Sequence, residues 1–422
     1  MTRTLFAGGQ VFDGTGSAPE RGDVLVEDGR IIEIGTGLDG DEVVDCQGAT
    51  LLPGLFDCHV HVTVSEIGLL PRVQQPFSYQ FFAAARNLAR TLDIGITTVR
   101  DAGGADLGIK QAVEDGLVPG PRMRISVSLI SPTGGHGDGW AVSGHCVPLS
   151  VPHPGRPRSI ADGPEEMRRV ARELLRAGAD VLKVCTTGGV LSPRDDPKHS
   201  QFTPEELDVL VTEARMQGRE VMAHAQGSEG VKNAIRAGIR SIEHGIYLDD
   251  EAIELMLANG TWLVPTLIAP VAVIRAAEAG ASLPESSVRK ARDVATVHAE
   301  SVRRAAEAGV KIAMGTDSGV GPHGTNLEEL PLMRACGMTP AQVLAATTSS
   351  AADLLGLGEE LGRLAPGYRA DVVVVNGDGL DLAGLAGNIR EVWQNGVRVV
   401  DHGAERGSGA SVNGAVDRIP AG

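Results

Sequence analysis

Six residues of types that can hold divalent metal ions stand in short apolar segments, five of them toward the C-terminal ends and the lysine inside its segment. They are two histidines one residue apart, a lysine, two further histidines and an aspartate: His59, His61, Lys183, His224, His244 and Asp317. Because successive side chains of a strand point to opposite faces, His59 and His61 share a face. A single histidine at a strand end is more often a hydrogen-bonded structural residue than a ligand. Four histidines and an aspartate in equivalent positions instead predict a ligand set for a borderline metal such as zinc.

Apolar segments alternate with helical patterns along the middle of the chain. The helical patterns are rich in Ala, Arg, Glu and Leu, and Gly or Ala closes each of them, as is usual at helix C-termini. This alternation predicts an α/β fold, a (β/α)8 TIM barrel, whose active site lies at the C-terminal ends of the strands. The eight predicted strands lie within residues 55–62, 95–104, 124–132, 180–189, 220–227, 240–245, 261–268 and 310–319.

The sequence pattern at both ends of the chain differs from that of the middle. Short alternating segments there are separated by turn signals, such as Asp13-Gly14 and Asp28-Gly29, which are typical of antiparallel hairpins. We therefore expect a small β-sandwich domain built from both termini. The predicted division is an N-terminal sandwich segment at 1–54, the metal-dependent hydrolase barrel at 55–358, a C-terminal sandwich segment at 359–405 and a flexible tail at 406–422.

The composition excludes several classes of partner. The chain has 38 basic and 54 acidic residues, a net charge of −16, and only 3% aromatic residues. These values argue against nucleic acid and against an anionic membrane surface as the main partner. Five scattered cysteines, no signal-peptide pattern and no long apolar segment favour a soluble cytoplasmic protein.

The motifs together resemble a known family. The segment LPGLFDCHVHV is similar to the first-strand His-x-His motif of the amidohydrolase superfamily, and RLAPGYRADVVVVNGD (363–378) is also typical of it. The six residues above, in the same chain order, resemble its binuclear members. The resemblance implies that His59, His61 and Asp317 hold the more buried metal, and that His224 and His244 hold the second.

The same resemblance implies a mechanism. Lys183 would bridge two divalent metal ions, with Zn²⁺ expected, as an N-carboxylated lysine, since an ammonium group has no lone pair to offer a cation. A metal-bridging hydroxide would attack the scissile carbonyl, and Asp317 would pass its proton to the leaving amine. His136, in SPTGGHGD, would stabilise the oxyanion.

The substrate prediction comes from KVCTTGGVLSP (183–193) and GTDSGVGPHGTN (315–326). Both resemble a branch containing imidazolonepropionase-like amidohydrolases, prolidase-type dipeptidases, Xaa-Arg/Lys carboxypeptidases and ochratoxin-cleaving relatives. We therefore expect hydrolysis of dipeptides or N-acyl amino acids with release of a free amino acid. Dipeptidases of this branch often carry a tyrosine after the fifth-strand histidine, where this chain has Gln226. Further candidates for substrate binding are Tyr247 for the carbonyl, and Arg194 and His323 for a carboxylate.

Other functions remain open at this stage. A cyclic-amide hydrolase or deaminase can use the same barrel, but such deaminases typically lack the bridging lysine, which Lys183 supplies here. A non-enzymatic oligomeric scaffold is a remote alternative, because such relatives usually lose metal ligands. By analogy with the superfamily we expect a homo-oligomer that acts on a small-molecule amide.

Overall fold

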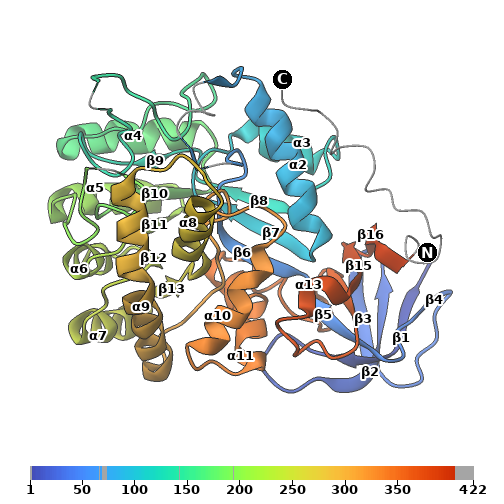
Figure 1. Ribbon diagram of the computed structural model, residues 1–422. Coiled ribbons are helices and arrows are strands. Elements are labelled where there is room, and N and C mark those ends of the chain that lie inside the picture. The colour runs from blue at the N-terminus through green and yellow to red at the C-terminus, as the bar shows by residue number, and fades with distance from the viewer. Residues whose placement is uncertain (1, 66, 69–73, 142, 193, 404–422) are drawn as a thin grey trace.

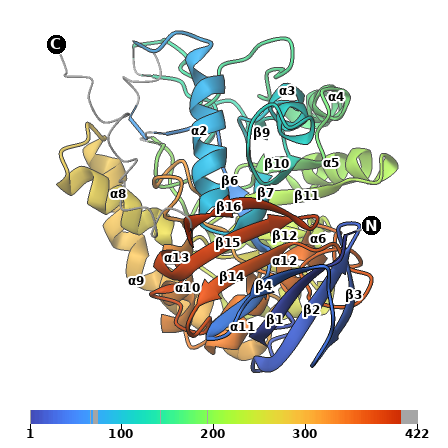
Figure 2. The same ribbon diagram turned by 90° about the vertical axis from the view of Figure 1, so that its right-hand side faces the viewer.

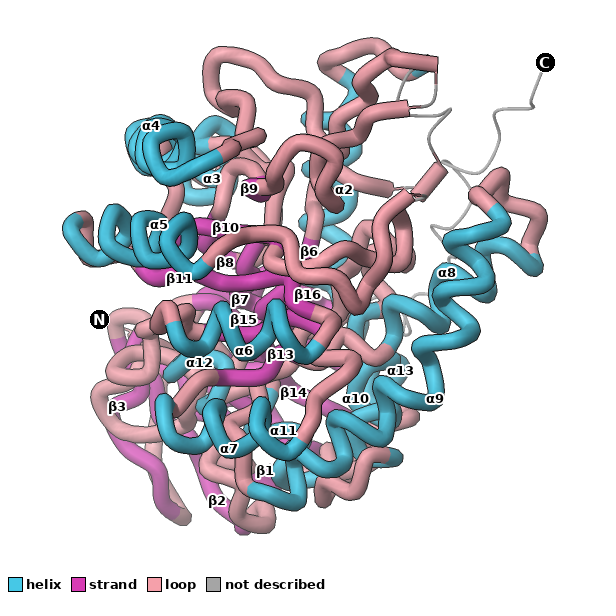
Figure 3. The backbone as a smooth tube through the Cα atoms, turned by 90° about the vertical axis from the view of Figure 1, so that its left-hand side faces the viewer, coloured by secondary structure: helices cyan, strands magenta, loops and turns pink. Residues whose placement is uncertain are grey.

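The centre of the molecule is a barrel of parallel strands surrounded by helices (Figures 1 and 3). The computed structural model describes residues 2–65, 67–68, 74–141, 143–192 and 194–403. Each strand predicted from the sequence lies in this barrel, so the α/β barrel fold is confirmed. The regular barrel strands are β6 (Leu55–Val60), β7 (Ile96–Asp101), β8 (Arg122–Ile125), β9 (Leu129–Ile130), β10 (Val181–Cys185), β11 (Glu220–Ala225), β12 (Ser241–His244) and β13 (Trp262–Val264).

The barrel departs from a regular cylinder at two positions. The predicted third strand is divided at residues 126–128, where Val127 has a φ of 66°. As a result β8 pairs only with β7, and β9 pairs only with β10. The predicted eighth strand is extended but irregular: Leu263 donates to the Lys311 carbonyl at 2.8 Å, and Asp317 donates to the His59 carbonyl at 2.7 Å. This segment therefore closes the barrel between β13 and β6 without a continuous ladder.

Helices cover the outside of the barrel because each has one apolar face. In α4, for example, Met167, Val170, Ala171 and Leu174 are buried, while the intervening arginines and glutamates face solvent. Thr203 starts α5 with a reciprocal capping box to Glu206. The described helices are α2 (Tyr79–Asp93), α3 (Leu107–Glu114), α4 (Gly163–Arg176), α5 (Pro204–Met216), α6 (Ser228–Arg236), α7 (Asp250–Asn259), α8 (Ile268–Glu278), α9 (Glu285–Ala308), the 3-10 helix η1 (Asn326–Glu328), α10 (Glu329–Ala335), α11 (Pro340–Ala346), α12 (Ser349–Leu354) and α13 (Leu385–Asn388).

Strands from the two ends of the chain lie together beside the barrel (Figure 2). They form one eight-stranded hydrogen-bonded sheet in which β5 joins β1 to β14. Phe6, Leu51, Val372 and Trp393 meet in its core, so both termini contribute to one small domain as expected. The strands are β1 (Thr4–Val11), β2 (Glu20–Glu27), β3 (Arg30–Gly35), β4 (Glu42–Asp45), β5 (Ala49–Pro53), β14 (Val372–Asn376), β15 (Ile389–Gln394) and β16 (Val397–Asp401).

Of the two hairpin turns predicted in this domain, one is a tight turn and the other is a longer loop. Asp28 and Gly29 form a tight turn between β2 and β3, with φ values of 49° and 74°. The Asp13-Gly14 pair instead lies in a longer loop between β1 and β2, where the Asp13 carboxylate accepts hydrogen bonds from Thr15. The predicted tail at 406–422 lies outside the described residues. Among the described helices, none has both the length and the apolar character required to cross a membrane.

Candidate metal centre and active site

A cavity of about 1030 Å³ opens at the C-terminal ends of the barrel strands. Every strand-end residue predicted to bind metal lines this cavity. Five of them are buried, and Asp317 is partly exposed. The residues that the structure brings together there are His59, His61, Lys183, His224, His244 and Asp317.

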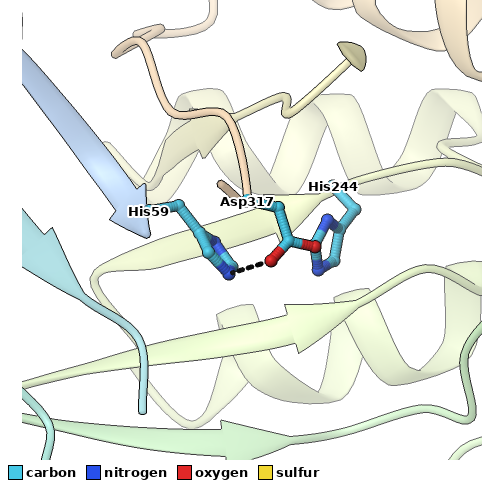
Figure 4. Close-up of side chains that lie close together, drawn as sticks. All are labelled: His59, His244 and Asp317. Atoms are coloured by element: carbon cyan, nitrogen blue, oxygen red, sulfur yellow. Dashed lines mark ion pairs between the residues drawn. The ribbon is translucent and has the colours of Figure 1, made fainter. Parts of the chain in front are cut away.

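Three of these side chains lie close enough to share one ion. The potential ligand atoms of His59, His244 and Asp317 are all within 4.8 Å of one another (Figure 4). The Asp317 Oδ1 atom lies 3.5 Å from His59 Nε2 and 3.2 Å from His61 Nε2. Imidazole and carboxylate groups at this spacing suit a divalent metal of the zinc type.

The backbone at two of these positions is unusual. Asp317 has a φ of 61° and His244 a φ of 74°, although both carry a Cβ atom. Such left-handed conformations cost about 1–3 kcal/mol and persist where surrounding contacts impose them, often at functional sites. Here the His59 carbonyl accepts a hydrogen bond from the Asp317 backbone N–H at 2.7 Å, which fixes the turn after the eighth segment.

Each histidine in the centre has one ring nitrogen already engaged. The Nδ1 atom of His61 lies 2.7 Å from the Gly103 carbonyl, and the Nδ1 atom of His244 lies 2.7 Å from Thr266 Oγ1. In His224 the engaged atom is Nε2, which lies 3.0 Å from the Gly188 carbonyl. Partners of this kind orient metal-bound imidazoles and leave the other nitrogen for the ion.

The orientation of His59 depends on a buried ion pair. Its Nδ1 atom lies 2.7 Å from Oε2 of Glu243, whose Oε1 accepts a hydrogen bond from Arg100 at 2.9 Å. Burial would raise the pKa of Glu243, but the Arg100 guanidinium and the His59 hydrogen bond outweigh it and hold that pKa low. Glu243 is therefore a carboxylate that orients the His59 ring through its Nδ1 atom.

Lys183 is the chemically unsatisfied member of the group. Its side chain is buried, and its Nζ atom has no hydrogen-bond partner among the described residues. Burial lowers the pKa of this amine below its ordinary value. A neutral amine in this position can react with carbon dioxide, and the resulting carbamate would offer two oxygen ligands. The donor set thus fits a metal centre bridged by a modified lysine.

The comparisons with known proteins agree with this geometry. The sequence profile of the amidohydrolase family matches residues 50–400. The chain belongs to the amidohydrolase family. It is a hydrolase of amide or peptide bonds, and members of this family are generally metal-dependent.

Several members of the family are similar to this chain in sequence or in structure. The chain is 38% identical over 344 residues to an ochratoxinase of Aspergillus niger, covering 78% of this chain and 71% of that protein. It is similar to the crystal structure of a Xaa-Pro dipeptidase with methionine bound in its active site, with 34% identity and a TM-score of 0.86 over 94% of this chain and 99% of that one. A prolidase complexed with N-methylphosphonate-L-proline gives 33% identity and a TM-score of 0.86 over 95% and 100%.

In this amidohydrolase, His136 lies beside the ligands predicted to bind metal. Its ring stacks on the ring of His224, with centroids 4.2 Å apart and an angle of 18° between the planes. Its Nδ1 atom lies 2.6 Å from Ser192 Oγ. His136 lines the cavity, as a group that contacts a substrate must.

The other predicted substrate-binding residues divide into two pairs. Gln226 and Arg194 line the cavity. The Gln226 side chain is buried, and its Oε1 atom has no partner among the described residues, whereas Arg194 is exposed with its guanidinium 5.1 Å from the Trp140 ring. Both are therefore available to a bound molecule.

Tyr247 and His323 do not reach the cavity of the amidohydrolase. The Tyr247 ring packs beneath the Lys198 ammonium group at 5.0 Å. His323 is buried with its Nε2 atom 3.2 Å from the His61 carbonyl, so it supports the backbone of the His-x-His segment. Neither is among the residues that line the cavity, which argues against the predicted substrate contacts.

Two residues that support the metal-binding histidines were not predicted from the sequence, although their position in apolar strand segments could have indicated them. Glu243 and Asp57 are acidic residues inside apolar strand segments, SIEH and LFDCH. Both are fully buried, and Asp57 accepts hydrogen bonds from the His59 backbone, Thr316 and Asn326. An acidic residue in a buried strand requires a polar partner, so each could have been identified as a support for the centre.

Proposed function

We propose that this hydrolase is metal-dependent and cleaves the amide bond of dipeptides or N-acyl amino acids, releasing a free amino acid. The observation that carries the proposal is the buried Lys183 Nζ atom, unpartnered and in the same cavity as four histidines and Asp317. An unmodified amine in that environment would be a costly defect. As a carbamate between two cations it would instead be a required ligand.

The proposed ligand set contains every predicted metal-binding residue. His59, His61 and Asp317 would hold one ion, His224 and His244 the other, and carboxylated Lys183 both. The imidazole and carboxylate donors favour Zn²⁺. When bound, the metal ions would supply Lewis-acid polarisation of the carbonyl and a water of lowered pKa.

Two side chains of this protein would handle the proton and the developing charge. Asp317 would accept the proton of the attacking water and deliver it to the leaving amine. His136 would donate a hydrogen bond to the carbonyl oxygen as negative charge develops there. Both line the cavity, and both therefore face the space that the scissile bond would occupy.

The remaining cavity wall favours substrates with a bulky apolar group. Val190, Ile246, Val273 and Val294 form one apolar cluster that lines the cavity between the loop after β10 and helices α8 and α9. The proteins named as relatives, an ochratoxinase and a Xaa-Pro dipeptidase, support an amide with an amino-acid leaving group. Gln226 and Arg194 are the polar groups proposed to bind the ends of such a substrate.

The cellular compartment and the oligomeric state form a separate part of the proposal. All five cysteines are free, and four are buried, which suits a reducing compartment such as the cytoplasm. A homo-oligomeric state is proposed from the family resemblance.

The test is release of free amino acid from a library of dipeptides and N-acyl amino acids. The zinc-loaded protein would be compared with Lys183→Ala and with Lys311→Ala, a control lysine whose ammonium lies near Trp262 outside the cavity. We expect cleavage of one substrate class, two metal ions per wild-type chain and an inactive Lys183→Ala variant. A fully active Lys183→Ala variant would contradict the bridged centre. Two bound ions without cleavage would contradict the proposed substrate class, and cyclic amides and deamination substrates would be tested next.

A further inference from the structure

His136 is held by a polar cluster that lies outside the metal-binding set. The cluster consists of Ser192 and Asp195, in the loop after β10, and Lys290 of helix α9. The Nδ1 atom of His136 lies 2.6 Å from Ser192 Oγ and 3.5 Å from Asp195 Oδ2. Ser192 Oγ also donates to Asp195 Oδ1. The Asp195 side chain is only 8% exposed, so this carboxylate is shielded from water.

The cluster defines which nitrogen of His136 faces the substrate. A serine hydroxyl has a single hydrogen, and in Ser192 that hydrogen points to Asp195 Oδ1, the nearer of its two acceptors, since the Gly189 carbonyl lies 3.4 Å away. The Ser192 oxygen can then only accept from the ring, so Nδ1 of His136 carries a hydrogen. Nε2 is the ring nitrogen that remains for a molecule in the cavity. It can donate a hydrogen bond only when it also carries a hydrogen, that is, in the imidazolium form, for which the Asp195 carboxylate 3.5 Å from Nδ1 is the counter-ion.

Lys290 fixes the carboxylate and its loop. Its ammonium group donates to the carbonyls of Gly189, Ser192 and Asp195 at 2.7, 2.6 and 2.9 Å, and lies 3.5 Å from Asp195 Oδ1. The Lys290 side chain is 13% exposed. This largely shielded cation thus joins three backbone positions of the loop to helix α9.

The loop also confines the ring from the side. A Cβ atom on Gly189 would lie 2.2 Å from His136 Cε1, so the ring lies directly against the Gly189 backbone. The ring also stacks on His224. The ring is therefore held by contacts with Gly189 and His224, while Ser192 and Asp195 determine its rotation.

We infer that Asp195 and Lys290 are positioning residues for His136, which hold its ring with Nε2 toward the scissile carbonyl. The inference rests on the proposed function, because it assigns His136 a contact with the reacting carbonyl. Neither residue reaches a metal ligand with its own side-chain hydrogen bonds among the described residues, so their effect on the reaction would pass through His136.

Kinetics of five single variants test the inference. Asp195→Asn and Lys290→Met are compared with two controls: Asp196→Asn in the same loop and Arg289→Met, an exposed neighbour on α9. We expect kcat to fall about 10–100-fold in the first pair, with KM and metal content unchanged within about twofold, because the loss of an oxyanion donor acts on kcat. Lys290→Arg should recover some of the loss. The controls should stay within about twofold of wild type.

A double-mutant cycle separates positioning from general damage to the loop. In a His136→Ala background, Asp195→Asn should cost less than about twofold in kcat, since the group that it orients is gone. Equal losses with and without His136 would overturn the inference, as would unchanged kinetics of both single variants.

A readout independent of turnover distinguishes this inference from the proposed function. In protein labelled with ¹⁵N-histidine, the His136 resonance is assigned by its loss in His136→Ala, and the hydrogen on each ring nitrogen is read from long-range couplings. Wild type should carry hydrogen on Nδ1, and Asp195→Asn should alter that signal. If no amide is cleaved but this change is seen, the positioning role stands and only the substrate proposal fails. An unaltered signal would overturn the positioning role.

Discussion

The Glu243 carboxylate lies 2.7 Å from the Nδ1 atom of His59, although 184 residues separate them in the chain. The contact joins the sixth barrel strand to the first across the interior. Arg100, on the second strand, completes it through Glu243 Oε1. An imidazole that donates a hydrogen bond to a carboxylate is a better metal ligand. The buried Glu243 is therefore expected to increase the affinity of the site for metal.

Replacement of Glu243 should weaken metal binding without unfolding the barrel. Glu243→Gln keeps the volume but removes the negative charge that supports His59, and we expect about 10–100-fold weaker metal affinity. The measurement is competition with a chromophoric chelator. Glu254→Gln, an exposed carboxylate on α7, is the control and should bind metal as wild type does. Equal affinities in all three proteins would refute the supporting role.

Loss of Arg100 should instead reduce the stability of the fold. Its guanidinium bonds the Cys58 carbonyl at 2.7 Å, Ser241 at 3.2 Å and Glu243 at 2.9 Å, all in the buried interior. Arg100→Met leaves the Glu243 carboxylate buried without its guanidinium partner, which we expect to lower the free energy of unfolding by about 3–5 kcal/mol. Urea unfolding measures the change. The exposed Arg86→Met should change it by less than about 0.5 kcal/mol.

Gly189→Ala should displace His136 with little effect on folding elsewhere. The added Cβ would meet the ring at 2.2 Å, and the ring is already held by its stacking on His224 and its contact with Ser192. We expect kcat to fall by about 10²-fold or more, as when an oxyanion donor is removed. Gly387→Ala, where the new Cβ has open space, is the matched control. Full activity in Gly189→Ala would show that the ring position is not critical.

Asp195 should contribute stability that is lost in acid. Burial raises its pKa, but the contacts with His136, Ser192 and Lys290 outweigh this and hold the pKa well below its usual range. A carboxyl whose folded-state pKa is depressed stabilises the fold fully above its unfolded pKa of about 4 and progressively less below it. The advantage of wild type over Asp195→Asn, about 2 kcal/mol at neutral pH, should therefore shrink as pH falls below about 4. Urea unfolding of both proteins from pH 7 to 3 checks this, and a constant difference would contradict it.

The barrel and its polar strand ends could be predicted from the sequence because both depend on local patterns. An apolar segment followed by a helical pattern predicts a strand–helix unit without knowledge of the neighbouring strands. His59 and His61 share a face by strand geometry alone. Lys183, within the fourth segment, and His224, His244 and Asp317, at the ends of the fifth, sixth and eighth segments, all line the cavity.

Tertiary contacts determined what could not be predicted. His323 follows the eighth segment as a substrate-binding loop residue would, yet it is buried against the His61 carbonyl. Asp195 gave no local signal, since only the approach of Lys290 from α9 brings it into the site. The strand pairing that divides the third segment likewise depends on both of its neighbours.

The interrupted ladder has a consequence for cooperativity. The three-stranded sheet of β6–β8 carries His59, the five-stranded sheet of β9–β13 carries Lys183 and His244, and Asp317 lies on the irregular segment between them. Ions held by these ligands would cross-link two sheets that hydrogen bonds leave separate at β8 and β9. Metal loading would thus add to the coupling that the shared core and the contacts of Glu243 with His59 and Arg100 already provide between the two halves of the barrel. In the metal-free chain, we expect the strands beside the interruption to exchange their amide hydrogens faster than in the metal-loaded chain.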